Sequence, residues 1–268
     1  MVQQRTKRLR FSSQVEWLSA LSLHAVRDRI DGNWDVTAAM RAPEALLQRI
    51  DSIPGMETGS RRLVVLMPQL GDFDSLEYAQ ALAGVLPELD QAGMRLLAIG
   101  IGDPGSADRF CAFTGFPRSC LQVEPDNRLH AELGLYEGLQ APGGPWPNLL
   151  LMCAGIGSPG TLAEVFRGYT GDRSAPQRLT TPLFRLAGGD GFQRPFELAS
   201  VRLQNMVEVL GRWRTYVPCD DFITQRGGTF VLEADDSLLY VHRDQGILGF
   251  SATMAKPLDF LKPFVALT

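Results

Sequence analysis

Two short, unbroken apolar runs constrain the fold of this chain most strongly. Leu63–Met67 and Leu96–Ile99 show no alternation of polar and apolar residues, which is typical of short strands that are buried on both faces. Between them, apolar residues recur at helical spacing from Leu76 to Leu86. A strand, a helix and a second strand in this order predict parallel strands that are joined by a right-handed crossover. The centre of the fold is therefore expected to be α/β.

Both ends of the chain are expected to extend this core. Thr229–Leu232 and Leu238–Val241 are β-rich runs around a short polar turn, and they predict an antiparallel hairpin. Residues 1–60 carry a capping box and apolar side chains at helical spacing, so they predict a helical N-terminal extension. A last helix is expected from Pro257 to Phe264. We therefore expect residues 61–268 to form one domain around a mixed sheet.

Residues 140–218 interrupt the alternation of strands and helices. This stretch is rich in Pro and Gly, and it predicts helices at Leu149–Ala154, Thr161–Tyr169 and Phe196–Trp213. A long insertion in a compact domain is often functional, and Trp, Tyr and Arg are the residues that dominate protein interfaces. Two alternatives stay open: an α-rich cover over one face of the sheet, or a surface for a protein partner within residues 144–214.

Charge and motif content exclude several classes of protein. The net charge of −4 would not steer the molecule towards a nucleic acid. The four cysteines form no CxxC and no Cys/His cluster with zinc spacing, so no metal is expected. The glycine-rich segment 155–160 lacks the Lys-Ser/Thr ending of a phosphate loop, and no cofactor is expected. No secretory signal and no apolar stretch of membrane-spanning length is found, which predicts a cytoplasmic protein.

A basic arm, Arg5–Arg10, lies near the N-terminus and is followed by Phe11. One interpretation is a terminus that only improves solubility. The other is a contact with an anionic partner, and peripheral contact with membrane headgroups is one form of it.

Two segments carry a resemblance to a known family. The first is Leu63–Gly102, and the second is Arg226–Leu232 followed by Leu239–Asp244. Together they resemble the peroxiredoxin-like branch of the AhpC/TSA family, within the thioredoxin superfamily. The resemblance covers about residues 62–140 and 220–262. It implies an α/β thioredoxin-like fold with a central mixed sheet and flanking helices.

The resemblance also implies a place for a reactive cysteine. In the family this cysteine lies in the loop after the first core strand, where the N–H groups and dipole of the next helix stabilise a thiolate. On that pattern the loop keeps Pro68 and Gly71, while Asp72 stands at the first cysteine's position and Ser75 at the second's. A carboxylate and a hydroxyl cannot form a sulfenic acid. The resemblance therefore implies the fold and argues against the activity.

The charged residues of this loop have competing interpretations. Asp74 is expected to cap the helix, with Glu77 completing a capping box. Asp72 is either a solvated loop carboxylate or a permanent anion that takes the place of an oxidised cysteine. The resemblance makes Arg226, just before the strand that contains Thr229, a candidate neighbour of Asp72. It would act either as a group that polarises peroxide or as a plain salt-bridge partner.

The leading hypothesis is a non-catalytic binding or scaffold protein of the peroxiredoxin-like family. The alternative is an active antioxidant oxidoreductase that reduces peroxide with Cys111 or Cys120, although both residues are also expected as core packing. Cys153 lies in an apolar run and is expected to be inert. A third hypothesis is a small-molecule site near Asp72 and Arg226. We call this place, where Asp72 and Ser75 replace the two cysteines, the degenerate site. Arg194–Ala199 is most similar to cyanobacterial and plastid forms, which points to a partner in the photosynthetic or stress apparatus.

Overall fold

The computed structural model describes residues 40–178 and 191–267. The basic arm Arg5–Arg10 and residues 1–39 of the predicted extension lie outside the described part. Contacts within the chain group residues from Met40 onward into one unit. The domain boundary proposed at residue 60 stays a prediction.

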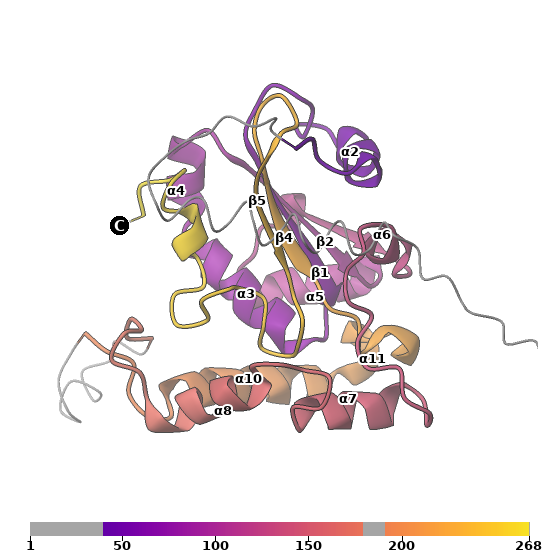
Figure 1. Ribbon diagram of the computed structural model, residues 1–268, viewed down its shortest axis with the longest axis vertical. Helices are drawn as coiled ribbons and strands as arrows, with labels where there is room; N and C mark the ends of the chain where they lie inside the picture. Colours follow the sequence, from indigo (N-terminus) through magenta and orange to yellow (C-terminus); the bar gives the residue numbers. More distant parts are fainter. Residues whose placement is uncertain (1–39, 179–190, 268) are drawn as a thin grey trace, which may run out of the picture. The chain divides into compact units, whose positions relative to one another are not determined.

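Within the described residues, five strands form a mixed sheet in the order β3-β2-β1-β4-β5 (Figure 1). β1 (Arg62–Gln69), β2 (Arg95–Ile101) and β3 (Leu121–Glu124) run parallel to one another. β4 (Gly228–Leu232) pairs antiparallel with β1, and β5 (Leu238–Arg243) completes the hairpin. A βαβ unit and a β-hairpin, joined by the pairing of β1 with β4, make up the thioredoxin-like fold, and this confirms the predicted fold class.

Helices cover both faces of this sheet. On one face lie α3 (Phe73–Ala83), α4 (Leu86–Gln91) and α5 (Pro104–Thr114). On the other lie α2 (Glu44–Asp51) and α6 (Arg128–Glu132). The two layers explain why the parallel strands are apolar without alternation, because neither face of the sheet meets water.

The side chains of β1 alternate between two hydrophobic cores. Leu63, Val65 and Met67 belong to the core beneath α3 and α5. Val64 and Leu66 belong to the core beneath α2 and α6. Successive side chains of a strand point to opposite faces, so an unbroken apolar run supplies both cores at once.

The helices of the insertion lie across one end of the sheet, below α3 and α5 in the view of Figure 1, and they contact these two helices. It contains α7 (Pro145–Cys153), α8 (Thr161–Thr170), α10 (Glu197–Gly211) and α11 (Trp213–Tyr216). α10 packs against α3 and α8, α11 packs against α5, and α7 packs against α8 and the 3-10 turn η2 (Asp220–Phe222). The α-rich insertion is confirmed, but its helices rest mainly on other helices rather than on a face of the sheet.

Proline explains two differences from the sequence prediction. The helix expected from Pro257 to Phe264 is wrong, and only a 3-10 turn, η3 (Asp259–Leu261), forms there. Pro263 has no N–H, so it cannot donate the hydrogen bond to the carbonyl of Asp259 that a continuing helix would need. The helix after β1 is also divided, because α3 ends at Gly84 and Pro87 lies in the first turn of the separate helix α4.

No described helix could cross a bilayer. α10 has 15 residues, whereas a transmembrane helix needs about 20 consecutive apolar residues. The prediction that the chain has no membrane-spanning segment therefore holds for the part of the chain that the structure describes.

Candidate functional site

The loop between β1 and α3 places Asp72 at a helix N-terminus. Asp72 is the N-cap of α3, and its carboxylate accepts a hydrogen bond from the backbone N–H of Asp74 at 2.9 Å. The prediction that Asp74 caps this helix is wrong, because the helix already begins at Phe73. Gly71 is required by close packing, since a Cβ at this position would lie 2.4 Å from Cγ2 of Val217. The interpretation of Asp72 as a solvated loop carboxylate is wrong as well, because its side chain is only 10% exposed.

The guanidinium of Arg226 is fully buried, and each of its three nitrogens already donates a hydrogen bond. Nη2 donates to Asp72, Nη1 to Oδ2 of Asp74 at 3.3 Å, and Nε to the carbonyl of Thr224 at 3.2 Å. The salt bridge that the sequence allowed between Arg226 and Asp72 is therefore present. Burial opposes the charge of Arg226, but the two carboxylates still hold its pKa above the usual value.

Two buried carboxylates adjoin this ion pair. Asp74 also accepts the backbone N–H of Leu248 at 2.7 Å, and Asp244 accepts the backbone N–H of Gly227 at 3.2 Å. Burial raises the pKa of Asp74 well above its usual value, and the neighbouring carboxylate of Asp72 adds to the effect. Burial also raises the pKa of Asp244 to about 7, despite the guanidinium. Asp74 and Asp244 therefore ionise less readily than exposed carboxylates do.

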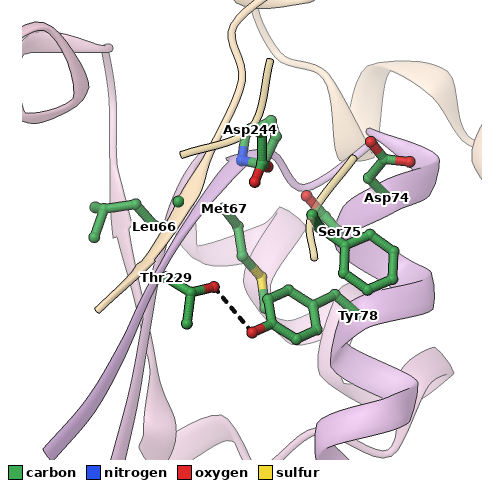
Figure 2. A pocket seen from close by; sticks show the side chains of 10 residues that line it. Leu66, Met67, Asp74, Ser75, Tyr78, Thr229 and Asp244 are labelled. Atoms are coloured by element: carbon green, nitrogen blue, oxygen red, sulfur yellow. Dashed lines mark hydrogen bonds between the residues drawn. The ribbon is translucent and has the colours of Figure 1, made fainter. Parts of the chain in front are cut away.

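A cavity of about 10 Å³ lies next to these carboxylates (Figure 2). Its polar lining comes from Asp74, Ser75, Tyr78, Thr229 and Asp244. The hydroxyls of Tyr78 and Thr229 are hydrogen-bonded at 2.9 Å, and that of Ser75 donates to the carbonyl of Gln69 at 3.2 Å. A volume of this size holds at most about one water molecule. The cavity is therefore too small for the small-molecule site of the third hypothesis.

The structure brings together the five residues that the resemblance assigned to the degenerate site. Pro68, Ser75 and Thr229 line the cavity, and Arg226 with Asp72 forms the ion pair beside it. No cysteine is among the residues that line the cavity. Within the described residues, no group of three or more His, Cys, Asp or Glu side chains could hold a metal ion.

The two cysteines of the alternative hypothesis lie elsewhere. Cys111 is buried on α5, and Cys120 is half-buried in the 3-10 turn η1 (Arg118–Cys120). Burial raises the pKa of Cys111 to about 11 and also raises that of Cys120. A thiol with a pKa of about 11 is a thiolate in only about one molecule in 10,000 at pH 7, and the thiolate is the nucleophile.

Cys153 is exposed, which the sequence did not predict. It is the last residue of α7, and its thiol lies within the electrostatic influence of Asp72 and Arg226. Partial desolvation raises the pKa of the thiol, and the carboxylate of Asp72 adds to the effect. An apolar run such as Leu149–Cys153 gives no signal that one of its members faces solvent beside a charge.

His130 supports the end of β1 from the opposite face of the sheet. It is fully buried on α6, and its Nε2 lies 2.8 Å from the carbonyl oxygen of Met67. Burial lowers the pKa of His130 to about 4, so the ring is neutral at pH 7 and Nε2–H donates to this carbonyl. Nδ1 has no hydrogen-bond partner. A lone histidine carries no sequence pattern that could have predicted this role. Asp244 was also missed as a site residue, although it belongs to the hairpin segment that carried the resemblance.

A family model described as AhpC/TSA antioxidant enzyme matches residues 81–246. The match begins after Asp72 and Ser75, so it contains Arg226 and the hairpin but not the loop of the degenerate site. No curated protein matches this chain.

Solved structures similar to this chain include a bacterioferritin comigratory protein of Xanthomonas campestris, with 13% identity and a TM-score of 0.31 over 72% of this chain and 73% of that chain. A cysteine-to-serine mutant of peroxiredoxin Q from the same organism has 14% identity and a TM-score of 0.31, with the same shares covered.

Proposed function

We propose that this chain, which belongs to the AhpC/TSA antioxidant enzyme family, has lost thiol-based peroxide reduction and functions as a binding protein. The observation that carries the proposal is the ion pair between Asp72 and Arg226 at the N-terminus of α3. A helix N-terminus stabilises an anion. Asp72 supplies a permanent anion where the resemblance to the family calls for a thiolate, and no sulfur atom is there to be oxidised.

The energetics of Arg226 support the same conclusion. To polarise a peroxide, its guanidinium would have to leave Asp72 or Asp74 while it remains fully buried. Breaking a buried ion pair typically costs about 3–5 kcal/mol, which corresponds to a factor of about 10²–10³ or more in an equilibrium constant. Arg226 in this chain therefore holds the loop to the strand β4 rather than receiving a substrate.

The alternative function, a thiol oxidoreductase that uses Cys111 or Cys120, is less well supported. The pKa values of both thiols are raised by burial, whereas reactive cysteines have lowered pKa values in electropositive and partly exposed surroundings. Neither residue lies at the N-terminus of a helix of the described chain: Cys111 is near the C-terminal end of α5 and Cys120 ends a 3-10 turn.

The binding role is assigned to the parts of the chain outside the degenerate site. We propose that a protein partner contacts the insertion within residues 144–214 or the basic arm Arg5–Arg10. A cytoplasmic location fits this role, with peripheral membrane contact of the arm as the alternative. The similarity of Arg194–Ala199 to cyanobacterial and plastid forms makes the photosynthetic or stress apparatus the first place to search for the partner.

A peroxide assay tests the loss of activity. The full chain is incubated with hydrogen peroxide or an alkyl hydroperoxide and a dithiol reductant, beside Cys111→Ser and Cys120→Ser variants. We expect no consumption above the rate of the reductant alone in any of the three. Turnover by the wild type that disappears in either serine variant would establish the thiol oxidoreductase instead.

A gain-of-function variant tests the assignment of the loop. Asp72→Cys places a thiol at the N-terminus of α3, where we expect its pKa to be lowered by the helix dipole and by Arg226. The new thiol should react with an alkylating reagent faster than Cys153 does in the same chain. If it reacts no faster than Cys153, the position does not correspond to that of a reactive cysteine and the proposal fails.

A further inference from the structure

The helices of the insertion have an inverted distribution of polar and apolar side chains. On α8, four residues at helical spacing point outward and are exposed: Leu162, Val165, Phe166 and Tyr169. A helix on the surface of a soluble domain normally has its apolar stripe towards the core. Here the apolar stripe faces away from the domain.

The charged residues of the same helix point inward and are paired. Glu164 and Arg167 are only 15% and 13% exposed, and they form a salt bridge at 2.7 Å. Arg167 also donates to the carbonyl of Met254 at 3.1 Å, and Glu164 is paired with Arg202 of α10. The polar side chains of α8 are thus paired within the chain. These pairs hold the polar side of the helix inward and its apolar stripe outward.

α10 repeats this arrangement beside α8. Leu203, Val207 and Leu210 are 53–63% exposed, whereas Arg202 pairs inward with Glu77 of α3 at 2.8 Å. Phe196, at the start of α10, is 60% exposed. α8 and α10 pack against each other, which places their outward stripes on neighbouring helices.

The two stripes contact each other. The rings of Tyr169 and Phe196 meet edge to face, with centroids 6.0 Å apart. At the other end of α8, Leu162 lies so close to Gly155 that a Cβ there would be 3.2 Å from its side chain. Gly155 precedes Ile156, which is exposed, so the surface extends to the segment after α7. Leu150 of α7 is exposed as well. We call this surface the apolar face. Its ten exposed residues are Leu150, Ile156, Leu162, Val165, Phe166, Tyr169, Phe196, Leu203, Val207 and Leu210.

The apolar face is large enough for a stable interface. A large apolar or aromatic side chain has on the order of 150–250 Å² of surface, and ten such residues here are roughly half exposed. Together they present on the order of 1,000 Å² of apolar surface, whereas monomeric proteins rarely expose patches above a few hundred Å². Among the described residues, Met40 is the one exposed large hydrophobic residue outside the insertion.

We infer that the apolar face is covered by the apolar face of a second copy of this chain. A standard interface buries about 800 Å² on each partner, so the area suffices for a dimer. In a twofold interface the same patch lies on both sides and must complement itself. The ten exposed side chains of the face are all apolar or aromatic, so they bring no like charges together across such an interface.

The inward direction of the arginines within α8 and α10 argues against a lipid surface as the occupant. Helices that lie in a membrane interface carry Lys and Arg on a polar face that reaches the headgroups. Here Arg167 and Arg202 turn inward to Glu164 and Glu77. This inference rests on the proposed role of the insertion as a binding surface, and it names the partner.

Sedimentation velocity over a wide concentration range tests the inference on the full chain. The wild type is expected to be a dimer, and Phe166→Glu and Val207→Glu should each weaken the dimer by at least about 30-fold, as charges at the centre of an interface do. Met40→Glu is the matched control, since it places the same charge on an exposed apolar residue outside the face, and it should leave the dimer intact. Because Phe166 and Val207 are 66% and 63% exposed, circular dichroism should show both variants folded.

Each other outcome overturns the inference. A wild type that stays monomeric at every concentration refutes it, and so does a dimer that survives both glutamate variants. A monomer that floats with phosphatidylcholine or phosphatidylglycerol vesicles and loses this property in Phe166→Glu would show that lipid covers the face. The peroxide assay is independent of all these results, so a failure here leaves the argument on Asp72 and Arg226 untouched.

Discussion

The buried carboxyl of Asp244 predicts that the protein loses stability as the pH rises from acid to neutral. The pKa of this group is about 7 in the folded chain because burial disfavours its charge, whereas an aspartate in an unfolded chain has a pKa of about 3.9. Between these two values the folded state binds the proton and the unfolded state does not. The free energy of unfolding therefore falls by about 1.4 kcal/mol per pH unit, about 4 kcal/mol in all.

Asp244→Asn is the perturbation that isolates this effect. The asparagine has nearly the same shape, and its Oδ1 can accept the backbone N–H of Gly227 as the carboxylate does. The charged neighbours Arg226 and Asp72 stay in place, as does His242, whose Nε2 lies 3.4 Å from Oδ1 of Asp244. The new amide group takes the place of Oδ1 of Asp244, which has no hydrogen-bond partner in the wild type. Its N–H therefore has no ready acceptor. An unsatisfied donor adds a constant cost of about 1–3 kcal/mol, so the test lies in the slope.

Urea denaturation followed by circular dichroism, at a series of pH values from 4 to 8, measures the slope. The difference in unfolding free energy between the variant and the wild type should rise in favour of the variant by about 4 kcal/mol across this range. A difference that does not change with pH would refute the reasoning, because it would mean that Asp244 is ionised in the fold as easily as in the unfolded chain.

Asp236→Asn is the matched control, because it should give the opposite slope. Asp236 is also buried, but hydrogen bonds from Arg62, at 2.6 Å, and from Arg41 and Thr58 hold its pKa below the usual value despite that burial. Its ionised form therefore stabilises the fold above the pKa of the unfolded chain, and this contribution is lost on acidification. The variant should be less stable than the wild type at pH 7, and the deficit should shrink as the pH falls.

The remaining predictions concern the ends of β1 and α3 and the thiols. His130→Gln should make the protein less sensitive to acid by about 3 kcal/mol between pH 6.5 and 4, because the unfolded histidine takes up a proton before the buried one does; denaturant titrations at the two pH values measure this, and an unchanged acid sensitivity would contradict it. Asp72→Ala should cost about 3–5 kcal/mol, because it removes both a helix cap and a partner of the buried Arg226; a loss below about 1 kcal/mol in the same titration would show that the ion pair does not form. An aromatic disulfide reagent should modify the exposed Cys153 at least about tenfold faster than the buried Cys111; peptide mass spectrometry identifies the sites, and the reverse order would contradict the described burial.

Part of the candidate site could be predicted from the sequence because it depends on local order along the chain. The loop with Pro68 and Gly71 follows an apolar strand, and Asp72 precedes a helical pattern, so the resemblance could align them with a cysteine position. The pairing of Arg226 with Asp72 followed from the same alignment, although 154 positions separate the two residues along the chain.

The rest of the site could not be predicted because it depends on the direction in which individual side chains point. Asp74 follows Asp72 by two residues, and the sequence favoured it as the cap; the backbone instead turns its carboxylate inward to Arg226 and Leu248. Cys153 closes an apolar run yet faces solvent. In both cases the residue type is compatible with either direction, and the packing of a distant segment decides between them.

The sequence by itself determined the elements whose signal is continuous along the chain: the apolar strands β1 and β2, the hairpin of β4 and β5, and the helix that Asp72 begins. Only the tertiary structure decided which side of α8 and α10 is covered. Helical periodicity shows that Phe166 and Tyr169 share one face and that Glu164 and Arg167 share another. It does not show which face turns inward. The ion pairs with Arg202 and Glu77 settle this, because they hold the charged side of both helices against the domain and leave the apolar side outside.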